Sequence, residues 1–380
     1  MQPLSVYIHI PFCAAKCGYC DFYSHRPREG EADRYIRALK NEIALYRNLL
    51  DARGIYTVYI GGGTPSLLGT DRLLAVLGAL MPQMADAKEI TIEGNPESML
   101  DLDISTLIDA GVNRFSMGVQ SASDALLTRM GRIHDAETAM RAFRHLRSGG
   151  ADNINLDFIS SVPGENAADV EASLAMIRAL QPEHVSLYSL ILEEGTPFYE
   201  RYFDSRDSAS EERDRLHVHA YARGLSEMGY GQYEISNFAK PGRECRHNLH
   251  YWDLGEYIGI GAAACGNLGD TRYGNHRSMR AYFAATEAKR SPREYTERLK
   301  PIDRDNEYIV LGLRKNVGIA FDAVLPSGAT FGAAYTTEIE EFTKSGLLHT
   351  HKGRIALTDR GRDLANIVEL GFFRLEEDAK

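Results

Sequence analysis

Extended apolar stretches alternate with helical patterns through the first half of this chain, and this alternation limits its fold more than any other feature. Strands are predicted over residues 4–10, 55–60, 89–93, 114–119, 153–159 and 184–192. Helical spacing of apolar residues predicts helices over 32–50, 71–80, 104–110, 136–148 and 168–180. Strands that alternate with helices form right-handed βαβ units, so residues 1–195 are predicted to be an α/β domain with a parallel sheet. Periodicity does not decide between an open sheet and a barrel.

Three of the chain's five cysteines lie close together, directly after the first predicted strand. Cys13, Cys17 and Cys20 have the spacing C-x3-C-x2-C, and Pro11 ends the strand before them. Thiolates suit zinc or iron–sulfur clusters, but a structural zinc site takes four ligands in paired C-x2-C units. Three ligands favour a cluster that keeps one iron open, where the amine and carboxylate of S-adenosylmethionine can chelate. The alternatives are a group of buried thiols and a zinc-stapled structural protein.

The same spacing, with an aromatic residue directly before the third cysteine, resembles the signature of the radical S-adenosylmethionine superfamily. Here the aromatic residue is Tyr19. The resemblance implies a 4Fe-4S cluster held by Cys13, Cys17 and Cys20. It also implies a partial (β/α)6 barrel, in which the ligand lies at the C-terminal ends of the strands.

Composition and charge indicate a large globular protein rather than a secreted, membrane or nucleic-acid-binding one. A chain of 380 residues with 44% hydrophobic and 25% charged residues can bury a sizeable core. Few cysteines argue against a disulfide framework, and no signal-like N-terminus or apolar run of membrane-spanning length is present. The net charge of -10 argues against a nucleic acid partner. We therefore expect a cytoplasmic protein without stable membrane insertion.

Unusual residues gather where the predicted strands end. The second strand runs into Gly61-Gly62-Gly63-Thr64-Pro65, which leaves a bare backbone that a ligand can approach. Glu93 and Gln120 end the next two strands, and Asp157 lies within the fifth. An acid inside an apolar strand needs a partner or a function. For these residues taken singly, the alternatives are a simple glycine turn and structural hydrogen bonds.

Four motifs in order resemble one group within the superfamily, the oxygen-independent coproporphyrinogen III oxidases and their relatives. They are Tyr-x-His-Ile-Pro-Phe-Cys from Tyr7, the Gly-Gly-Gly-Thr-Pro loop, Glu-x-Asn-Pro from Glu93, and Phe-Ser-Met-Gly-Val-Gln from Phe115. This resemblance implies that S-adenosylmethionine is contacted by Tyr7, Tyr19, Gly62, Gly63, Thr64, Glu93, Gln120, Arg132 and Asp157. The chain departs from the group at Ser160 and Ser161, where the group has tyrosine and glycine, and in the glycine-rich stretch 259–265.

Two features separate members of this group. The oxidase has a fourth cysteine two residues after the third, where this chain has Phe22. The oxidase also has a long N-terminal extension, whereas twelve residues precede Cys13 here. Both differences argue against the oxidase. The segment Cys245-Arg-His-Asn-Leu-His-Tyr-Trp252 instead resembles the HNxxYW signature of HemW-type haem chaperones.

The HNxxYW segment also suits haem on chemical grounds. The candidate haem residues are His247, His250, Tyr251 and Trp252, with Cys245 as a further possible ligand. The two aromatic residues offer flat apolar surface for stacking, and a histidine or the thiol can be the axial ligand of haem iron. Arg243 and Arg246 lie near enough in sequence to pair with propionates. The alternative is a structural helix cap or loop with aromatic packing.

Residues 196–300 are predicted to complete the barrel and to carry the HNxxYW segment, and residues 301–380 resemble the small winged-helix-like α+β domain of the family. The favoured interpretation is a haem chaperone that binds haem and delivers it to acceptor haemoproteins such as respiratory enzymes. Its rival is an oxygen-independent coproporphyrinogen III oxidase, or another radical enzyme acting on a tetrapyrrole. Enzymatic activity and a homodimer are both left open, and no catalytic residue is predicted.

Overall fold

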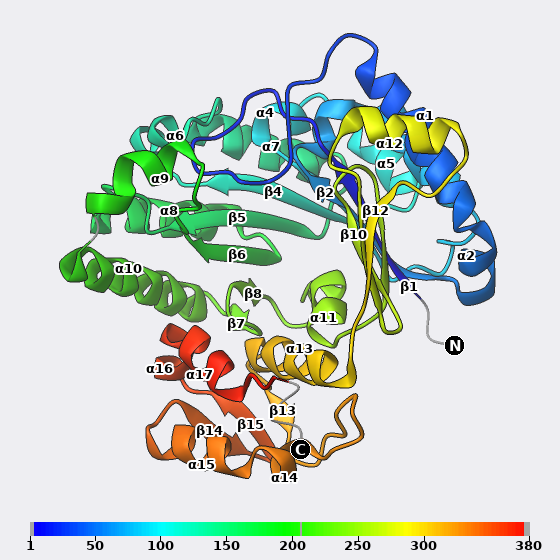
Figure 1. Cartoon of the computed structure of the whole chain (residues 1–380). Coiled ribbons are helices and arrows are strands. Elements are labelled where there is room, and N and C mark those ends of the chain that lie inside the picture. The colour runs from blue at the N-terminus through cyan, green and yellow to red at the C-terminus, as the bar shows by residue number, and fades with distance from the viewer. Residues whose placement is uncertain (1–3, 206, 376–380) are drawn as a thin grey trace.

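The computed structural model describes residues 4–205 and 207–375. The chain forms two lobes (Figure 1): a large one built on a curved sheet, and a small C-terminal one beneath it that begins with α13 (Pro301–Arg314). Residues 1–3 and 376–380, at the outer ends of the first and last predicted domains, lie outside the described part, as does residue 206. Among the described helices, none is both long and apolar enough to cross a membrane.

Six parallel strands in sequence order form the centre of the large lobe. They are β1 (Leu4–Ile10), β2 (Ile55–Gly62), β3 (Glu89–Gly94), β4 (Arg114–Gln120), β5 (Ile154–Ser160) and β6 (His184–Ser189). Each strand pairs in parallel with the next, which confirms the predicted α/β class and strand order. The predicted strand over 184–192 was too long, because Leu190 makes a last hydrogen bond to the Ser160 carbonyl and the chain then turns away.

Short strands extend this sheet on both sides, and the sequence patterns did not predict them. Beyond β1 lie β9 (Tyr257–Ile260), parallel to it, and then the antiparallel strands β10 (Cys265–Leu268), β11 (Thr271–Asn275) and β12 (Arg293–Arg298). Beyond β6 lie β8 (Asn237–Ala239) and β7 (Gly231–Gln232). Within the described residues the sheet therefore has twelve strands, in the order β12-β11-β10-β9-β1-β2-β3-β4-β5-β6-β8-β7.

The helices of the large lobe mostly follow the predicted pattern. The predicted ones are α3 (Thr70–Leu80), α5 (Ile104–Asp109), α7 (Ala136–Ser148) and α8 (Ala167–Leu180). The helical patterns given for the first 195 residues do not include two short helices within them, α4 (Pro96–Met99) and α6 (Asp124–Met130). The helices that follow residue 195 in this lobe are α9 (Pro197–Tyr202), α10 (Ser208–Glu227), α11 (Arg246–Trp252) and α12 (Met279–Glu287).

The single helix predicted over 32–50 is wrong, because the chain forms α1 (Glu31–Leu45) and α2 (Arg47–Arg53) with a break at Tyr46. The backbone of Tyr46 leaves the helical region there. Its side chain is buried, and its hydroxyl lies 3.1 Å from the hydroxyl of Tyr273 on β11. A contact with a strand more than two hundred residues away ends the helix, and helical periodicity does not report it.

The two faces of the parallel strands differ in chemistry. Residues at alternate positions, such as Val6, Ile8 and Ile60, belong to the apolar core packed against the helices. The positions between them are polar and line the inside of the curved sheet. They include Ser5, Tyr7 and His9 on β1, Thr57 and Tyr59 on β2, Glu89 and Glu93 on β3, Arg114 and Ser116 on β4, Asn155 and Asp157 on β5, and His184 and Ser186 on β6. The lumen of the barrel is therefore a hydrogen-bonded polar interior.

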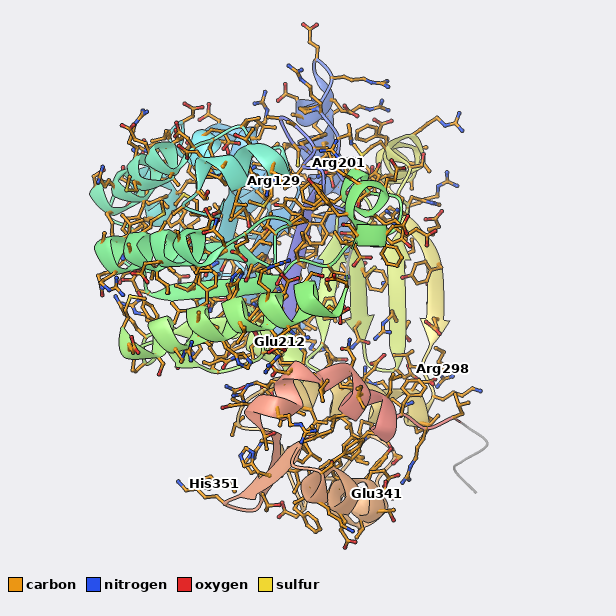
Figure 2. The ribbon with its side chains drawn as sticks, turned by 90° about the vertical axis from the view of Figure 1, so that its left-hand side faces the viewer. Arg129, Arg201, Glu212, Arg298, Glu341 and His351 are labelled. Carbon is orange, nitrogen blue, oxygen red and sulfur yellow. The ribbon has the colours of Figure 1, made fainter. Side chains whose placement is uncertain are left out.

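The C-terminal lobe has an apolar core of its own. Ile309 and Leu313 of α13 pack there with Phe331, Val368 and Phe372. Its remaining elements are β13 (Ile319–Ala320), α14 (Phe331–Ala334), α15 (Thr336–Lys344), β14 (Leu348–His351), β15 (Arg354–Leu357), α16 (Asp359–Asp363) and α17 (Ala365–Phe372), with sheet order β13-β15-β14. In Figure 2 this lobe, which carries Glu341 and His351, lies below the end of β12 that Arg298 marks.

The departure from the family pattern at Ser161 has a measurable cost. Ser161 follows β5 with a φ of 68°, a left-handed conformation that favours glycine. Because the strain of a side chain there exceeds the entropic cost of glycine, Ser161→Gly is expected to raise the free energy of unfolding by about 0.5–1 kcal/mol. Chemical denaturation measures this, and Ser160→Gly is the matched control. Ser160 lies in the strand and its hydroxyl donates to Glu165, so glycine there is expected to destabilise; a stabilising Ser160→Gly would contradict the account.

Candidate functional site

The three clustered cysteines lie on the loop that follows β1, which we call the cysteine loop (residues 11–30). In Figure 1 this dark-blue segment crosses over the sheet near α4 and α6. The Gly18 amide donates to the Met130 carbonyl at the end of α6 (3.1 Å), and the Gly18 carbonyl accepts from the Phe198 amide at the start of α9 (3.0 Å). The loop is thereby fixed above the C-terminal ends of the strands, where ligands bind in such folds.

Two of the thiols have polar neighbours that the sequence resemblance had singled out. The hydroxyl of Thr64 donates to Cys13 Sγ (3.4 Å), and Arg132 Nη1 donates to Cys17 Sγ (3.5 Å). Among the described residues, no three His, Cys, Asp or Glu side chains converge closely enough to hold a single metal ion. A cubane cluster would need a wider spacing of the cysteine sulfurs than a single metal ion, because each thiolate would bind a different iron.

The glycine-rich loop after β2 packs directly against the cysteine loop. A Cβ atom on Gly63 would lie 2.6 Å from the Phe12 carbonyl, and one on Gly62 would lie 2.5 Å from the His9 ring. The Thr64 amide donates to the Phe12 carbonyl at 2.7 Å. Glycine is therefore required here by close backbone approach, and the loop is more than a simple turn.

Two acids lie within electrostatic reach of each other in the upper part of the lumen. Glu93 accepts hydrogen bonds from the Tyr59 hydroxyl (2.6 Å) and the Gly62 amide (3.0 Å). Asp157 accepts from Asn155 Nδ2 at 2.8 Å. Burial raises the pKa of Glu93 to about 7, and the nearby charge of Asp157 adds to that increase. Burial also raises the pKa of Asp157. Glu93 can therefore hold or release a proton near neutral pH.

The raised pKa of Glu93 predicts a pH-dependent stability. Glutamate has a pKa of 4.5 when unperturbed and about 7 here, so the folded state binds more protons than the unfolded state between these values. Stability from this group is complete below the lower value and is lost as the pH rises through the upper one. We expect Glu93 by itself to lower the free energy of unfolding of the apoprotein by about 2–3 kcal/mol between about pH 5 and pH 8.

Glu93→Gln is expected to flatten this slope, and the exposed Glu194→Gln serves as the matched control. Glu42 also has a pKa raised to about 7 by burial, so a residual slope will remain in Glu93→Gln. Denaturation at a series of pH values measures the effect. Equal slopes in the wild type and in Glu93→Gln would contradict the assignment.

Gln120 and Arg132 lie near the cysteine loop at the end of β4. Gln120 has a φ of 69°, a strained conformation for a residue other than glycine, and is nearly buried. Arg132 Nη2 donates to Asn95 Oδ1 (2.6 Å) and to the Gly118 carbonyl (2.9 Å). The predicted adenosylmethionine residues from β1 to β5 are thus brought together around the upper lumen. Tyr19 packs edge to face on Phe198, with ring centroids 6.1 Å apart.

The HNxxYW segment forms α11, which lies at the opposite end of the lumen from the cysteine loop (Figure 1). Both ring nitrogens of His247 are engaged, Nδ1 with the Thr57 hydroxyl (2.8 Å) and Nε2 with the Tyr251 hydroxyl (2.9 Å). Burial lowers the pKa of His247 to about 3, with the charges of His250 and Arg114 acting in the same direction. His250 Nε2 bonds the Glu256 carbonyl at 2.9 Å. His247 is therefore a neutral, buried part of the lumen network.

Glu89, at the start of β3, holds the first turn of α11. Its carboxylate accepts from the amides of Arg246 (2.9 Å) and His247 (3.0 Å) and from Cys245 Sγ (3.3 Å). Arg114, at the start of β4, is 2% exposed; burial lowers its pKa, but neighbouring acidic groups, including Cys245 and Glu89, raise it overall. Burial raises the pKa of Cys245 to about 12, so the thiol is neutral.

Trp252, at the end of α11, faces the C-terminal lobe. The guanidinium of Arg314, the last residue of α13, lies 4.4 Å from the centroid of its ring. Arg314 also pairs with the fully buried Glu234 (3.3 Å), and Lys315 pairs with Asp253 next to Trp252. Trp252 and His247 therefore point into different surroundings.

A cavity of about 420 Å³ opens beside the cysteine loop, and its lining is largely aromatic: Tyr7, Phe22, Tyr23, Tyr251 and Tyr257. Of the four predicted haem residues, Tyr251 lines this cavity, whereas His247 lies behind Tyr251 and Trp252 faces the other lobe. His9, Cys265 and Arg277 also line it, and none of the three was predicted to be a site residue. The alternation of polar residues in β1 places His9 beside Tyr7, but no sequence pattern joins Cys265 or Arg277 to them.

Comparisons with known proteins agree with this geometry. The sequence profile of the radical SAM superfamily matches residues 7–177, and that of the HemN C-terminal domain matches residues 299–364. A Mycobacterium tuberculosis protein named heme chaperone HemW is 36% identical over 376 residues, 97% of this chain and 94% of its own length. The chain belongs to the HemW family. The HemW proteins of Bacillus subtilis and Escherichia coli are 33% and 38% identical, covering 96% and 78% of this chain.

The fold of this HemW family member also matches a solved structure over nearly its whole length. Coproporphyrinogen III oxidase (HemN) from Escherichia coli, a radical SAM enzyme, superposes with a TM-score of 0.82 and 23% identity, covering 98% of this chain and 90% of that one. At that identity the match concerns the fold alone. It confirms the predicted radical SAM barrel with a small C-terminal domain.

Proposed function

We propose that this protein is a haem chaperone, which binds haem and passes it to haem-accepting proteins such as respiratory enzymes in the cytoplasm. The observation that carries the proposal is the aromatic cavity between the cysteine loop and Tyr251 of the HNxxYW helix. Flat aromatic side chains around an open space suit a porphyrin, and the volume is within the range of small-molecule sites. Relatives that span nearly the whole chain are named heme chaperones, which supports the same function.

We further propose that Cys13, Cys17 and Cys20 hold a 4Fe-4S cluster whose open iron binds S-adenosylmethionine. The fit rests on the donor set and its surroundings, because Arg132 directs a cation at Cys17 Sγ and Thr64 donates to Cys13 Sγ. When bound, the cluster supplies an electron and a chelating iron. The chain's own contribution is to hold the three thiolates on one loop and to place the guanidinium of Arg132 beside Cys17.

The residues proposed to bind S-adenosylmethionine surround the upper lumen. Gly62 and Gly63 are proposed to contribute by letting the glycine-rich loop lie directly against the cysteine loop, where a Cβ atom on either would clash. Glu93 and Asp157 supply carboxylates that can accept from ribose hydroxyls or from the amine, and Gln120 supplies an amide beside them. Tyr7, stacked on Tyr59, and Tyr19, packed on Phe198, are proposed to add aromatic contacts.

The HNxxYW residues are proposed to shape the haem site together. Tyr251 contacts the ligand in the cavity, and His247 fixes the Tyr251 hydroxyl from behind at 2.9 Å. His250 and Trp252 anchor the two sides of α11, to the Glu256 carbonyl and to Arg314 respectively. Whether two copies of the chain associate is decided by measuring the mass of the haem-loaded protein.

A haem titration tests the proposal. The cluster is first reconstituted anaerobically, then ferric haem is added while the Soret band and the bound stoichiometry are followed. We expect saturable binding, followed by transfer when a haem-free acceptor is added. Absence of saturable haem binding would contradict the proposal. Formation of protoporphyrinogen from coproporphyrinogen with dithionite and S-adenosylmethionine, detected by mass spectrometry, would instead identify an oxidase.

Tyr251→Ala is expected to weaken haem binding about three- to tenfold, because an aromatic contact contributes about 0.5–1.5 kcal/mol beyond the area it buries. The affinity is taken from the same titration. Tyr199→Ala is the matched control, since Tyr199 stacks on Phe203 (4.3 Å between centroids) on α9, outside the cavity. If both variants bind alike, the haem does not use this cavity.

A further inference from the structure

We propose that the axial ligand of the haem iron is the thiolate of Cys265, in the aromatic cavity, with Arg277 pairing a haem propionate. This inference rests on the proposed haem-binding function and names the site at which it takes place. Neither residue belongs to the HNxxYW segment. Cys265 begins β10 and Arg277 lies between β11 and α12, so both come from the segment that follows β9.

The cavity suits a flat, largely apolar ligand with charged edges. Tyr7, Tyr251 and Tyr257 present aromatic surface from β1, α11 and β9, and Phe22 adds a side chain that is 63% exposed. A phenylalanine exposed to this extent gains by packing on an apolar ligand, because the contact removes its ring from water. The site thus offers porphyrin contacts on several sides.

Burial raises the pKa of the four tyrosines on the lining, which disfavours their ligating form, and leaves a histidine and a cysteine that differ in availability. His9 is 7% exposed, and both of its ring nitrogens are engaged, Nδ1 with the Tyr7 hydroxyl (2.9 Å) and Nε2 with the Tyr23 carbonyl (2.9 Å). Cys265 is exposed, and its sulfur contacts the Tyr295 hydroxyl at 3.6 Å. A tyrosine hydroxyl can donate to a thiolate, and hydrogen bonding of this kind tunes a metal-bound sulfur. Cys265 is therefore the ligand that needs no rearrangement.

Ligation of the haem iron by Cys265 needs no further reactant, because its atoms and electrons balance. The Fe–S bond forms between ferric iron and the sulfur, the thiol proton leaves to solvent, and no electron is transferred. Cysteine thiolate is an established type of axial haem ligand. The buried Cys245, whose thiol donates to Glu89, cannot take this role without opening α11.

Arg277 is placed to recognise the charged edge of the ligand. It is exposed, and its guanidinium lies 5.7 Å from the centroid of the Tyr23 ring on the cysteine loop. No ion pair of Arg277 occurs among the described residues. Guanidinium matches a carboxylate in a two-pronged hydrogen bond. Asp21, also on the lining, repels carboxylates, which favours placing the propionates towards Arg277.

Electron paramagnetic resonance of the haem-loaded, cluster-containing protein tests the axial ligand, because the oxidised 4Fe-4S cluster is diamagnetic and only ferric haem contributes. We expect the ferric signal of a thiolate-ligated haem and, after reduction under carbon monoxide, the long-wavelength Soret band of such a haem. Cys265→Ala should lose both signatures and bind haem at least about tenfold more weakly. Cys265→His should give a histidine-type spectrum. Cluster content and circular dichroism check that the variants fold.

Haem dimethyl ester tests the role of Arg277. Arg277→Gln should bind haem about three- to tenfold more weakly but bind the ester as the wild type does, since the ester has no carboxylate. Arg280→Gln is the matched control, an exposed arginine on α12 that is absent from the cavity lining. An equal loss in Arg280→Gln, or a loss that persists with the ester, would overturn the assignment.

The failures of the two proposals are distinguishable. If wild-type protein binds no haem, the proposed function fails. If it binds haem and Cys265→Ala retains the same resonance signal, Soret band and affinity, the chaperone function stands and Cys265 is not the ligand.

Discussion

Glu89→Ala is expected to lower the free energy of unfolding by about 3–5 kcal/mol, because it removes a buried carboxylate that accepts from three donors and whose charge favours the charged form of the buried Arg114. Arg114 is 2% exposed and lies near Glu89 at the N-terminal end of the lumen. The same substitution removes the acceptor for two amides and a thiol at the start of α11. Unpaired buried donors add to the cost.

Denaturant unfolding measures this change, with Glu297→Ala as the matched control. Glu297 also lies in a strand, but its side chain is exposed, so its loss is expected to change stability by no more than about 0.5 kcal/mol. A Glu89→Ala protein as stable as Glu297→Ala would show that α11 does not depend on this carboxylate. If Glu89→Ala does not fold, Glu89→Gln keeps one acceptor oxygen and should show an intermediate loss.

Cys17→Ala is expected to abolish the iron–sulfur cluster, with iron and labile sulfide falling to background after anaerobic reconstitution. A cubane held by three thiolates loses a protein bond to one iron, and Arg132 then faces no sulfur at that position. Binding of S-adenosylmethionine should be lost with the cluster, because the open iron is its proposed anchor. Iron analysis and equilibrium dialysis of radiolabelled S-adenosylmethionine measure the two effects.

Cys265→Ala is the control for this experiment, as it removes an exposed thiol outside the cysteine loop. We expect it to keep the full cluster. Conversely, Cys17→Ala should still show the thiolate-type haem signal, since the two sites use different cysteines. Cluster retention in Cys17→Ala would mean that another residue replaces the ligand, and would remove the case for a three-cysteine site.

The six parallel strands and most of the helices between them could be predicted from the sequence, because apolar periodicity records the face of each element that packs in the core. The same strands carry polar residues at alternate positions. These residues line the lumen, so the sequence pattern already indicated which side chains face it. The pattern is visible in β1, where Ser5, Tyr7 and His9 alternate with valine and isoleucines. Periodicity therefore predicted which strands surround the site, but not which side chains meet in the cavity.

The cavity could not be predicted, because its residues meet only through pairing between distant segments. Cys265 comes near Tyr7 because β9 pairs with β1, and β9 is four residues long, too short for a clear pattern. The HNxxYW motif was visible, but a motif does not say which way each side chain of α11 points. Thr57 and Glu89 fix that orientation, and both lie more than 150 residues earlier in the chain.

The position of α11 between the lumen and the C-terminal lobe has a thermodynamic consequence. Tyr251 lines the cavity and the next residue, Trp252, packs under Arg314, so a displacement of this seven-residue helix moves both contacts. A ligand that displaced α11 would therefore change the contact between the lobes, and a change in that contact would alter ligand binding by the same free energy. Because Trp252 is the chain's single tryptophan, its fluorescence reports on the contact between the two lobes without any added label.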